Sequence, residues 1–227
     1  MAPDIAFDLT LEHGRCVGVT LPEAAEAVDA LAETLAAAER ARAFDLPIPR
    51  RRTWTGGRAA MREALGRLGF PADAVATDDR GAPVLPPGVR GSITHKERIA
   101  AAMVALESSA CVGVDVEMDI ARSHDIASRV LRDAERAELV GLDAAGRARE
   151  VLLRFSAKEA IYKALDPFVR RYVDFKEMSV SPRPGGAALV TPYLREGEGP
   201  FAIEVRWRRF DGIVLTTARI ERVGQPR

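Results

Sequence analysis

Two short apolar segments in the middle of the chain place the strongest constraint on the fold. Residues 99–106 read IAAAMVAL, and residues 111–117 read CVGVDVE. Both have the length of a buried strand rather than that of a helix. Residues 5–10 and 15–21 alternate apolar and polar side chains, which predicts two further strands joined by a short turn.

Of the other segments, those before residue 166 predict four helices, and those after it predict four more strands. Runs rich in Ala, Glu and Leu predict helices over residues 22–42, 55–68, 125–140 and 147–165. Turn signals such as RPGG and FDG separate four more predicted strands, near residues 174–181, 186–191, 201–209 and 213–221. Residues 71–91 hold four Pro and three Gly and are predicted to be irregular. Strands and helices mix in both halves, which predicts an α+β fold.

Composition excludes some classes of protein. Lys plus Arg and Asp plus Glu each number 33, and a net charge of zero argues against binding of nucleic acid. No stretch has the length of a membrane span, and the N-terminus lacks the pattern of a signal peptide. The two cysteines, Cys16 and Cys111, do not form a CxxC motif. We therefore expect a cytoplasmic protein with one sizeable domain or two small ones.

The segment CVGVDVE places two acids on one face of its strand. Because side chains alternate along a strand, Gly113, Asp115 and Glu117 point to one side and the valines to the other. Asp115 and Glu117 are then about 7 Å apart, and their carboxylates can converge on one hard cation such as Mg²⁺. Gly113 is expected to leave room for a ligand beside them. The alternative is an antiparallel strand with one solvated face.

The segment VLLRFSAKEAIYKAL predicts a helix with an acid on its apolar side. At 100° per residue, Glu159 falls within the apolar arc that includes Phe155. A carboxylate in such a place is costly unless it is paired. Lys163 could pair with it as an ordinary i,i+4 neighbour. A metal ion shared with Asp115 and Glu117 explains better why an acid lies on the buried side, and we favour it.

Four blocks of sequence together resemble the 4′-phosphopantetheinyl transferases that serve siderophore, non-ribosomal peptide and polyketide synthesis. GVDVE and FSAKEAIYKAL meet every defined position of that family's pattern, (V/I)G(V/I)DxE followed by (F/W)(S/T)xKExxxK. RRRTWTGGR resembles the basic block before the family's first long helix. RGAPVLPPGVRGSITH resembles its G-x-P-x-x-P…G-S-(I/L)-(S/T)-H segment. The four blocks occur in the family's order over about residues 50–165.

The resemblance implies a fold and a reaction. It implies two similar α/β halves, residues 1–110 and 111–227, packed as a pseudo-dimer with coenzyme A between them. It implies a magnesium-dependent enzyme that moves the phosphopantetheine arm of coenzyme A to a serine of an apo acyl or peptidyl carrier protein, releasing 3′,5′-ADP. Because the two halves would already form the site, a monomer is expected.

The resemblance also implies roles for single residues. Asp115, Glu117 and Glu159 would bind Mg²⁺, and Glu159 would act as general base on the carrier serine. Lys163 would stabilise the phosphate oxygens or the leaving group. The residues expected to bind coenzyme A lie in the basic blocks and beside the metal acids: Arg50, Arg58, Arg80, Ser92, Thr94, His95 and Lys158. For the first of these, a solvated charge run over residues 50–52 is the alternative.

Other functions stay open on the sequence. A metal-dependent phosphohydrolase or nuclease also combines paired acids with a lysine, and a non-catalytic module that binds coenzyme A or a nucleotide could keep the basic blocks alone. The segment PFVRRYVDFK, with Arg170, Arg171 and Lys176, is a candidate surface for docking an acidic carrier protein, and an exposed loop without that role is the alternative.

Overall fold

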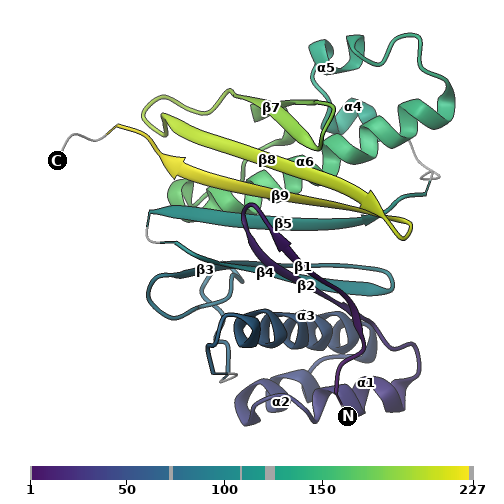
Figure 1. Ribbon diagram of the computed structural model, residues 1–227, viewed down its shortest axis with the longest axis vertical. Helices are drawn as coiled ribbons and strands as arrows, with labels where there is room; N and C mark the ends of the chain where they lie inside the picture. Colours follow the sequence, from purple (N-terminus) through teal and green to yellow (C-terminus); the bar gives the residue numbers. More distant parts are fainter. Residues whose placement is uncertain (1, 72–73, 108, 121–125, 225–227) are drawn as a thin grey trace. The chain divides into compact units, whose positions relative to one another are not determined.

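The computed structural model describes residues 2–71, 74–107, 109–120 and 126–224. The chain divides into two compact units, Met1–Ser108 and Ser109–Arg227 (Figure 1). Each unit is an antiparallel sheet crossed by one long helix. The predicted α+β class is therefore confirmed. Among the helices that the structure describes, none is both long enough and apolar enough to cross a membrane.

The first unit has a four-stranded sheet in the order β1-β2-β4-β3. Its elements along the chain are β1 (Ile5–Leu11), β2 (Gly14–Thr20), α1 (Ala25–Ala32), α2 (Ala37–Phe44), α3 (Ile48–Arg67), β3 (Val89–Lys96) and β4 (Ile99–Leu106). Helix α3 lies across one face of the sheet, and α1 and α2 pack on α3 (Figure 1). The core between helix and sheet is built from residues such as Val17, Met61, Leu65 and Val104.

Two glycines allow α3 to lie close to this sheet. A Cβ at Gly56 would come 2.1 Å from Leu21 Cδ2, and one at Gly57 would come 2.8 Å from Ile93 Cγ2. Neither distance is compatible with an ordinary side-chain contact. The pair in RRRTWTGGR therefore sets the packing distance of the helix that carries the basic block.

The second unit has a five-stranded sheet in the order β5-β9-β8-β7-β6, so β5 is an edge strand of it. Its elements are β5 (Ala110–Met118), α4 (Ala127–Val130), α5 (Asp133–Ala137), α6 (Ala144–Val169), the 3₁₀ turn η1 (Phe175–Glu177), β6 (Met178–Pro182), β7 (Ala187–Pro192), β8 (Phe201–Phe210) and β9 (Ile213–Arg222). Helix α6 packs against β5 and β9, while α4 and α5 lie near its N-terminal half (Figure 1).

Several predicted boundaries were wrong for local reasons. The helix expected over 22–42 is two helices, because the chain turns where the Thr34 hydroxyl donates to the Leu31 carbonyl at 2.7 Å. Helix α3 begins at Ile48 rather than at residue 55, since Pro49 in its first turn needs no N–H partner there. The helix expected over 125–140 is the short pair α4 and α5 within the described residues.

Candidate active site

The acidic face of β5 lies against α6. A Cβ at Gly113 would come 2.0 Å from the Ala160 carbonyl oxygen. The expectation that Gly113 leaves room for a ligand is therefore wrong, because the helix backbone itself fills that space. Two residues further along the same face, Ser156 of α6 donates to Asp115 at 2.8 Å. The sequence GVDVE thus serves both to seat α6 and to present acids to it.

Asp115 is anchored by two side chains of α6. Its Oδ1 accepts from Lys163 Nζ at 2.9 Å, and its Oδ2 accepts from the Ser156 hydroxyl. That hydroxyl lies 2.9 Å from Thr216 Oγ1 on β9, the strand neighbour of Asp115. Asp115 and Glu117 are both only 5% exposed. Strand, helix and neighbouring strand therefore hold one buried carboxylate in place.

Lys163 connects α6 to β5. Its ammonium donates to Asp115 and, at 2.9 Å, to the Val114 carbonyl. The predicted alternative was an i,i+4 pair with Glu159, but the hydrogen-bonded carboxylate of Lys163 is on the strand. Burial raises the pKa of Glu159, and the positive charge of Lys163 opposes that rise.

Glu159 is half-buried on α6 and has a raised pKa. Burial is the main cause, and the negative charge of Asp115 is the next. Lys163 opposes the shift, and Glu117 adds a smaller upward effect. The three acids predicted as metal ligands therefore share one electrostatic neighbourhood, in which ionisation of Glu159 is disfavoured.

This neighbourhood is not a preformed metal centre. Within the part of the chain that the structure describes, no group of three or more His, Cys, Asp and Glu is arranged to hold a metal ion. The donor chemistry nevertheless fits a hard cation, because Asp115, Glu117 and Glu159 offer only carboxylate oxygens, and the charges of the first two raise the pKa of Glu159 in addition to the effect of burial.

Lys158 is a predicted phosphate ligand whose ammonium has buried partners within its own unit. Its side chain is 1% exposed, and its ammonium donates to Glu135 Oε2 at 2.6 Å and to the Val130 carbonyl at 2.8 Å. Burial lowers the pKa of Lys158, and Glu135 opposes that shift. Sequence reasoning missed Glu135. Lys158 itself was the signal that could have found Glu135. A lysine on the buried side of a helix needs an acid nearby to compensate its charge.

A pocket adjoins Glu159 in the second unit. It has a volume of about 140 Å³ and lies between α6 and the chain that follows it. Glu159 and Tyr162 line it from α6, while Tyr172, Phe175 and Met178 line it from the following segment. The pocket is mostly apolar, and the charged residues that line it are Lys158, Glu159 and Asp174.

In the segment proposed from the sequence as a docking surface, PFVRRYVDFK, Arg171 forms ion pairs within the protein. Arg171 donates to both carboxylate oxygens of Glu177 and of Glu198, at distances of 2.6 to 2.9 Å. These hydrogen bonds lower the pKa of each glutamate. Arg171 therefore ties the chain after α6 to η1 and to a later loop. Arg170 and Lys176 remain on the exposed side of this segment.

In the first unit, Arg58 is the most constrained of the predicted coenzyme A ligands. It is 4% exposed on α3, stacks over Trp54 and donates to Thr77 Oγ1 at 2.5 Å. Its second terminal nitrogen is buried and has no hydrogen-bond partner among the residues that the structure describes. Burial lowers the pKa of Arg58, while the charge of Glu39 opposes this. An anion would satisfy this guanidinium.

The remaining predicted ligands of the first unit are spread over three places. Arg50 is exposed in the first turn of α3, and Arg80 is exposed in the loop before β3. Ser92, Thr94 and His95 belong to β3, a strand that the sequence analysis did not predict. Ser92 and Thr94 are buried on one face, whereas His95 is exposed on the other. The structure therefore does not bring these three side chains to one face.

Known proteins with similar sequences share one description. The sequence pattern of the 4′-phosphopantetheinyl transferase N-terminal domain matches residues 38–105, and that of the 4′-phosphopantetheinyl transferase superfamily matches residues 111–218. The chain is 34% identical to the 4′-phosphopantetheinyl transferase Npt of Nocardia iowensis, over 74% of this chain and 81% of that protein. It is 35% identical to Svp of Streptomyces mobaraensis, a protein of the same description, over 72% and 69% of the two chains.

A solved structure resembles about half of the chain. The holo-[acyl-carrier-protein] synthase of Thermotoga maritima superposes with a TM-score of 0.40 and 21% identity, over 49% of this chain and 62% of that one. The two matched patterns and the two relatives, in contrast, cover most of the sequence. The chain therefore belongs to the 4′-phosphopantetheinyl transferase superfamily.

Proposed function

We propose that the protein transfers the 4′-phosphopantetheine arm of coenzyme A to a serine hydroxyl of an apo acyl or peptidyl carrier protein and releases 3′,5′-ADP. The observation that carries the proposal is the group formed by Glu159, Asp115, Glu117 and Lys163. It combines a carboxyl of raised pKa with two buried carboxylates and a lysine, and it coincides with the blocks that define the family.

Glu159 is the proposed general base. Its carboxylate removes the proton of the carrier serine, whose oxygen forms a bond to the phosphorus that bears the pantetheine arm. The bond from that phosphorus to the oxygen of the 3′,5′-ADP group breaks, and 3′,5′-ADP departs with the electron pair. The raised pKa supports this role, since a base is most effective when its pKa lies near the working pH.

Lys163 and the acids of β5 would act on the phosphates. Lys163 carries a positive charge at the edge of the site, where it can stabilise charge on the leaving oxygen. We propose that Asp115, Glu117 and Glu159 hold Mg²⁺, which when bound would neutralise charge on the pyrophosphate. The mutual repulsion of these acids supports the proposal, since a cation relieves it.

The pocket beside Glu159 suits the pantetheine arm, and Arg58 suits a phosphate. The arm is a thin chain of methylene and amide groups, and the pocket walls from Tyr162, Tyr172 and Met178 are mostly apolar. Arg58 presents a desolvated guanidinium with an unused donor, which favours an anion such as the 3′-phosphate. Arg50, Arg80, Ser92, Thr94 and His95 stay proposed contacts of coenzyme A.

Transfer of phosphopantetheine is tested by measuring the mass of the carrier protein. The protein is mixed with coenzyme A, Mg²⁺ and each of several apo acyl and peptidyl carrier proteins, and the carrier is weighed by mass spectrometry. A gain of one phosphopantetheine on a serine is expected. No gain on any carrier would remove the transferase proposal. Release of 3′,5′-ADP without a carrier would favour the phosphohydrolase alternative.

A matched pair of variants tests the metal site. Glu117→Ala should lose the Mg²⁺-dependent rate by about 10²-fold while staying folded, since it removes one ligand carboxylate. Glu204→Ala, in the same sheet with a half-exposed side chain, should keep the rate. Wild-type turnover in Glu117→Ala would exclude Glu117 from the metal site.

A further inference from the structure

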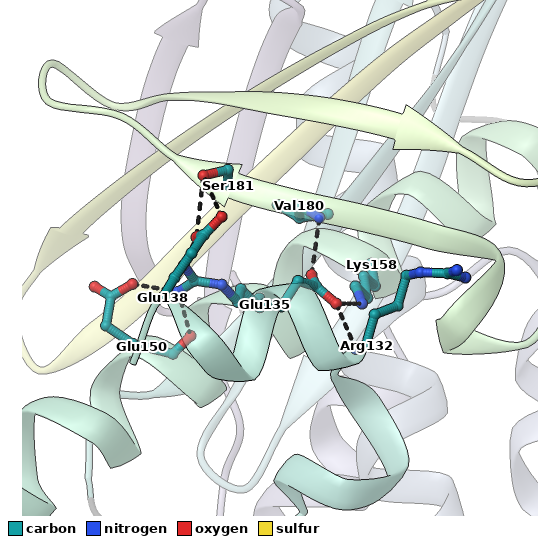
Figure 2. Close-up of polar contacts among 8 residues, drawn as sticks. Arg132, Glu135, Glu138, Glu150, Lys158, Val180 and Ser181 are labelled. Carbon is teal, nitrogen blue, oxygen red and sulfur yellow. Dashed lines mark hydrogen bonds and ion pairs between the residues drawn. The ribbon is translucent and has the colours of Figure 1, made fainter. Parts of the chain in front are cut away.

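The carboxylate of Glu135 is buried completely and, together with Lys158, connects four elements. Its Oε2 accepts from Lys158 Nζ of α6 at 2.6 Å and from the Arg132 backbone N–H at the start of α5 at 2.8 Å. Its Oε1 accepts from the Val180 backbone N–H of β6 at 2.8 Å. Lys158 in turn donates to Val130 at the end of α4. Figure 2 shows Glu135 between Lys158, Val180 and Arg132.

This arrangement is costly and specific. Both side chains are out of contact with water, at 1% and 0% exposure, and apolar residues in their place would commonly be as stable or more stable. Apolar contacts, however, allow sliding and rotation, whereas these hydrogen bonds define one position of α6. These hydrogen bonds therefore contribute to the position of α6 rather than to the stability of the fold.

The position that they define is that of the reacting turn. Lys158 directly precedes Glu159, so the two side chains point about 100° apart around α6. On the other side of the helix, Ser156 and Lys163 bond to Asp115. The turn that carries Glu159 is thus held from two directions, by β5 and by Glu135.

We propose that Glu135, through Lys158, is a positioning residue that sets the rotation of α6 and hence the direction of the Glu159 carboxylate. The proposal rests on the proposed function for its catalytic part. Glu135 touches neither substrate nor reacting atoms, and its effect is on the rate of the chemical step. Glu135 therefore contributes to the site, although its helix α5 has only five residues and contains none of the sequence blocks that resemble the family.

The neighbouring ion pair provides a matched control. One turn earlier on α6, Arg154 donates to Glu138 at 2.7 Å. Ser181 of β6 also donates to Glu138 (Figure 2). Glu138 is 44% exposed, and Arg154 has a second acid in Glu150. This pair also connects the chain at the end of α5 with α6 and β6, but its acid is solvent-exposed and Arg154 keeps Glu150 as a partner, so the loss of Glu138 should leave α6 in place.

The test compares Glu135→Gln/Lys158→Met with Glu138→Gln in the full-length protein. The double variant keeps the shape of both side chains and leaves no buried charge alone, so it should fold. The NH₂ group of the new amide must face the backbone N–H of either Arg132 or Val180, which then lacks an acceptor, so the melting temperature should be lower than that of the wild type. Amide exchange over residues 155–163 is expected to be at least about ten-fold faster in the double variant and unchanged in Glu138→Gln.

Turnover provides the second measurement. The double variant should lose at least about ten-fold in kcat, with the KM for coenzyme A changed by less than about three-fold, because orientation and not binding is affected. Glu138→Gln should keep both constants. Wild-type exchange, wild-type kcat, or an equal loss in Glu138→Gln would each overturn the proposal.

The two proposals fail in different ways. If the wild-type protein modifies no carrier, the proposed function fails. The positioning of α6 is then decided by amide exchange alone, for which unchanged exchange in the double variant is the negative result.

Discussion

At the scale of the single residue, the proposed role of Glu159 as a base conflicts with its surroundings. A base must be ionised to take a proton, but burial and the nearby charges of Asp115 and Glu117 disfavour its ionised form. Such a residue is retained for function at a cost in stability. One substitution can separate the loss of stability from the gain in activity.

Glu159→Gln should lower activity and raise stability together. The amide cannot accept the serine proton, so kcat should fall by about 10²- to 10⁴-fold. The same change removes a negative charge that its surroundings disfavour, so the melting temperature should rise. Carrier modification and thermal unfolding near pH 7 measure the two effects. A lower melting temperature would mean that Glu159 stabilises the fold.

Arg171 should make stability depend on pH. It lowers the pKa of Glu177 and of Glu198 in the folded protein. Stability from a lowered acid pKa is complete above the unfolded pKa of about 4.3 and is lost as the pH falls through the folded value. Arg171→Gln should therefore lower the melting temperature at pH 7, and its difference from wild type should shrink below about pH 4. A difference that stays constant between pH 7 and pH 3 would contradict this.

At the scale of the element, the distance between α6 and β5 determines whether the site can form. Gly113 lets the helix backbone approach the strand, and Ser156, Lys163 and Asp115 bond across the contact. A helix held further away would lose these hydrogen bonds together. Packing and chemistry therefore depend on the same glycine.

Gly113→Ala should be destabilising. Its Cβ would meet the Ala160 carbonyl, and such overpacking costs about 1–3 kcal/mol in the free energy of unfolding. Gly66→Ala in α3 is the control, because a Cβ there meets nothing within 4 Å and alanine favours a helix. Chemical denaturation measures both. An unchanged stability of Gly113→Ala would show that α6 can move away at no cost.

Elements with clear periodicity were predictable, and those decided by tertiary contacts were not. The strands on either side of the FDG turn have strong alternation, and β8 and β9 were found within a residue of their ends. β3 was missed because its Gly, Ser and Thr do not read as a strand without β4 beside it. The end of α6 was placed too early, because Pro167 fits into the last turn before Arg170 closes the helix in a left-handed conformation.

The nearness of the three acids could be predicted from the sequence, whereas their hydrogen-bond partners could not. Glu159 stood out because it falls within an apolar arc of its helix, and Asp115 and Glu117 stood out because they share one face of a strand. The partners of Lys158 and Lys163 could not be read locally, since Glu135 is 23 residues away and Asp115 is 48 residues away. Spacing along a helix identifies neighbours on that helix only.

At the scale of the whole molecule, ligand binding should appear as stability. A ligand that binds only the folded chain raises the free energy of unfolding, by about 2.7 kcal/mol at a concentration of a hundred times its Kd, and the melting temperature rises with it. Coenzyme A with MgCl₂ should therefore raise the melting temperature, and EDTA should remove part of the gain. In Glu117→Ala, EDTA should have no further effect. An equal effect of EDTA in both proteins would mean that the ion binds elsewhere.

The edge position of β5 also has a consequence for the order of folding. Asp115 lies opposite Thr216 of β9, so the register of the acidic strand is set by a segment about a hundred residues later. Closing so long a loop is slow compared with forming a helix. During synthesis, α6 can form while its acidic partner strand still lacks β9, and the site becomes complete only when the last strand has emerged from the ribosome. Activity should therefore return after helical content when the denatured chain refolds.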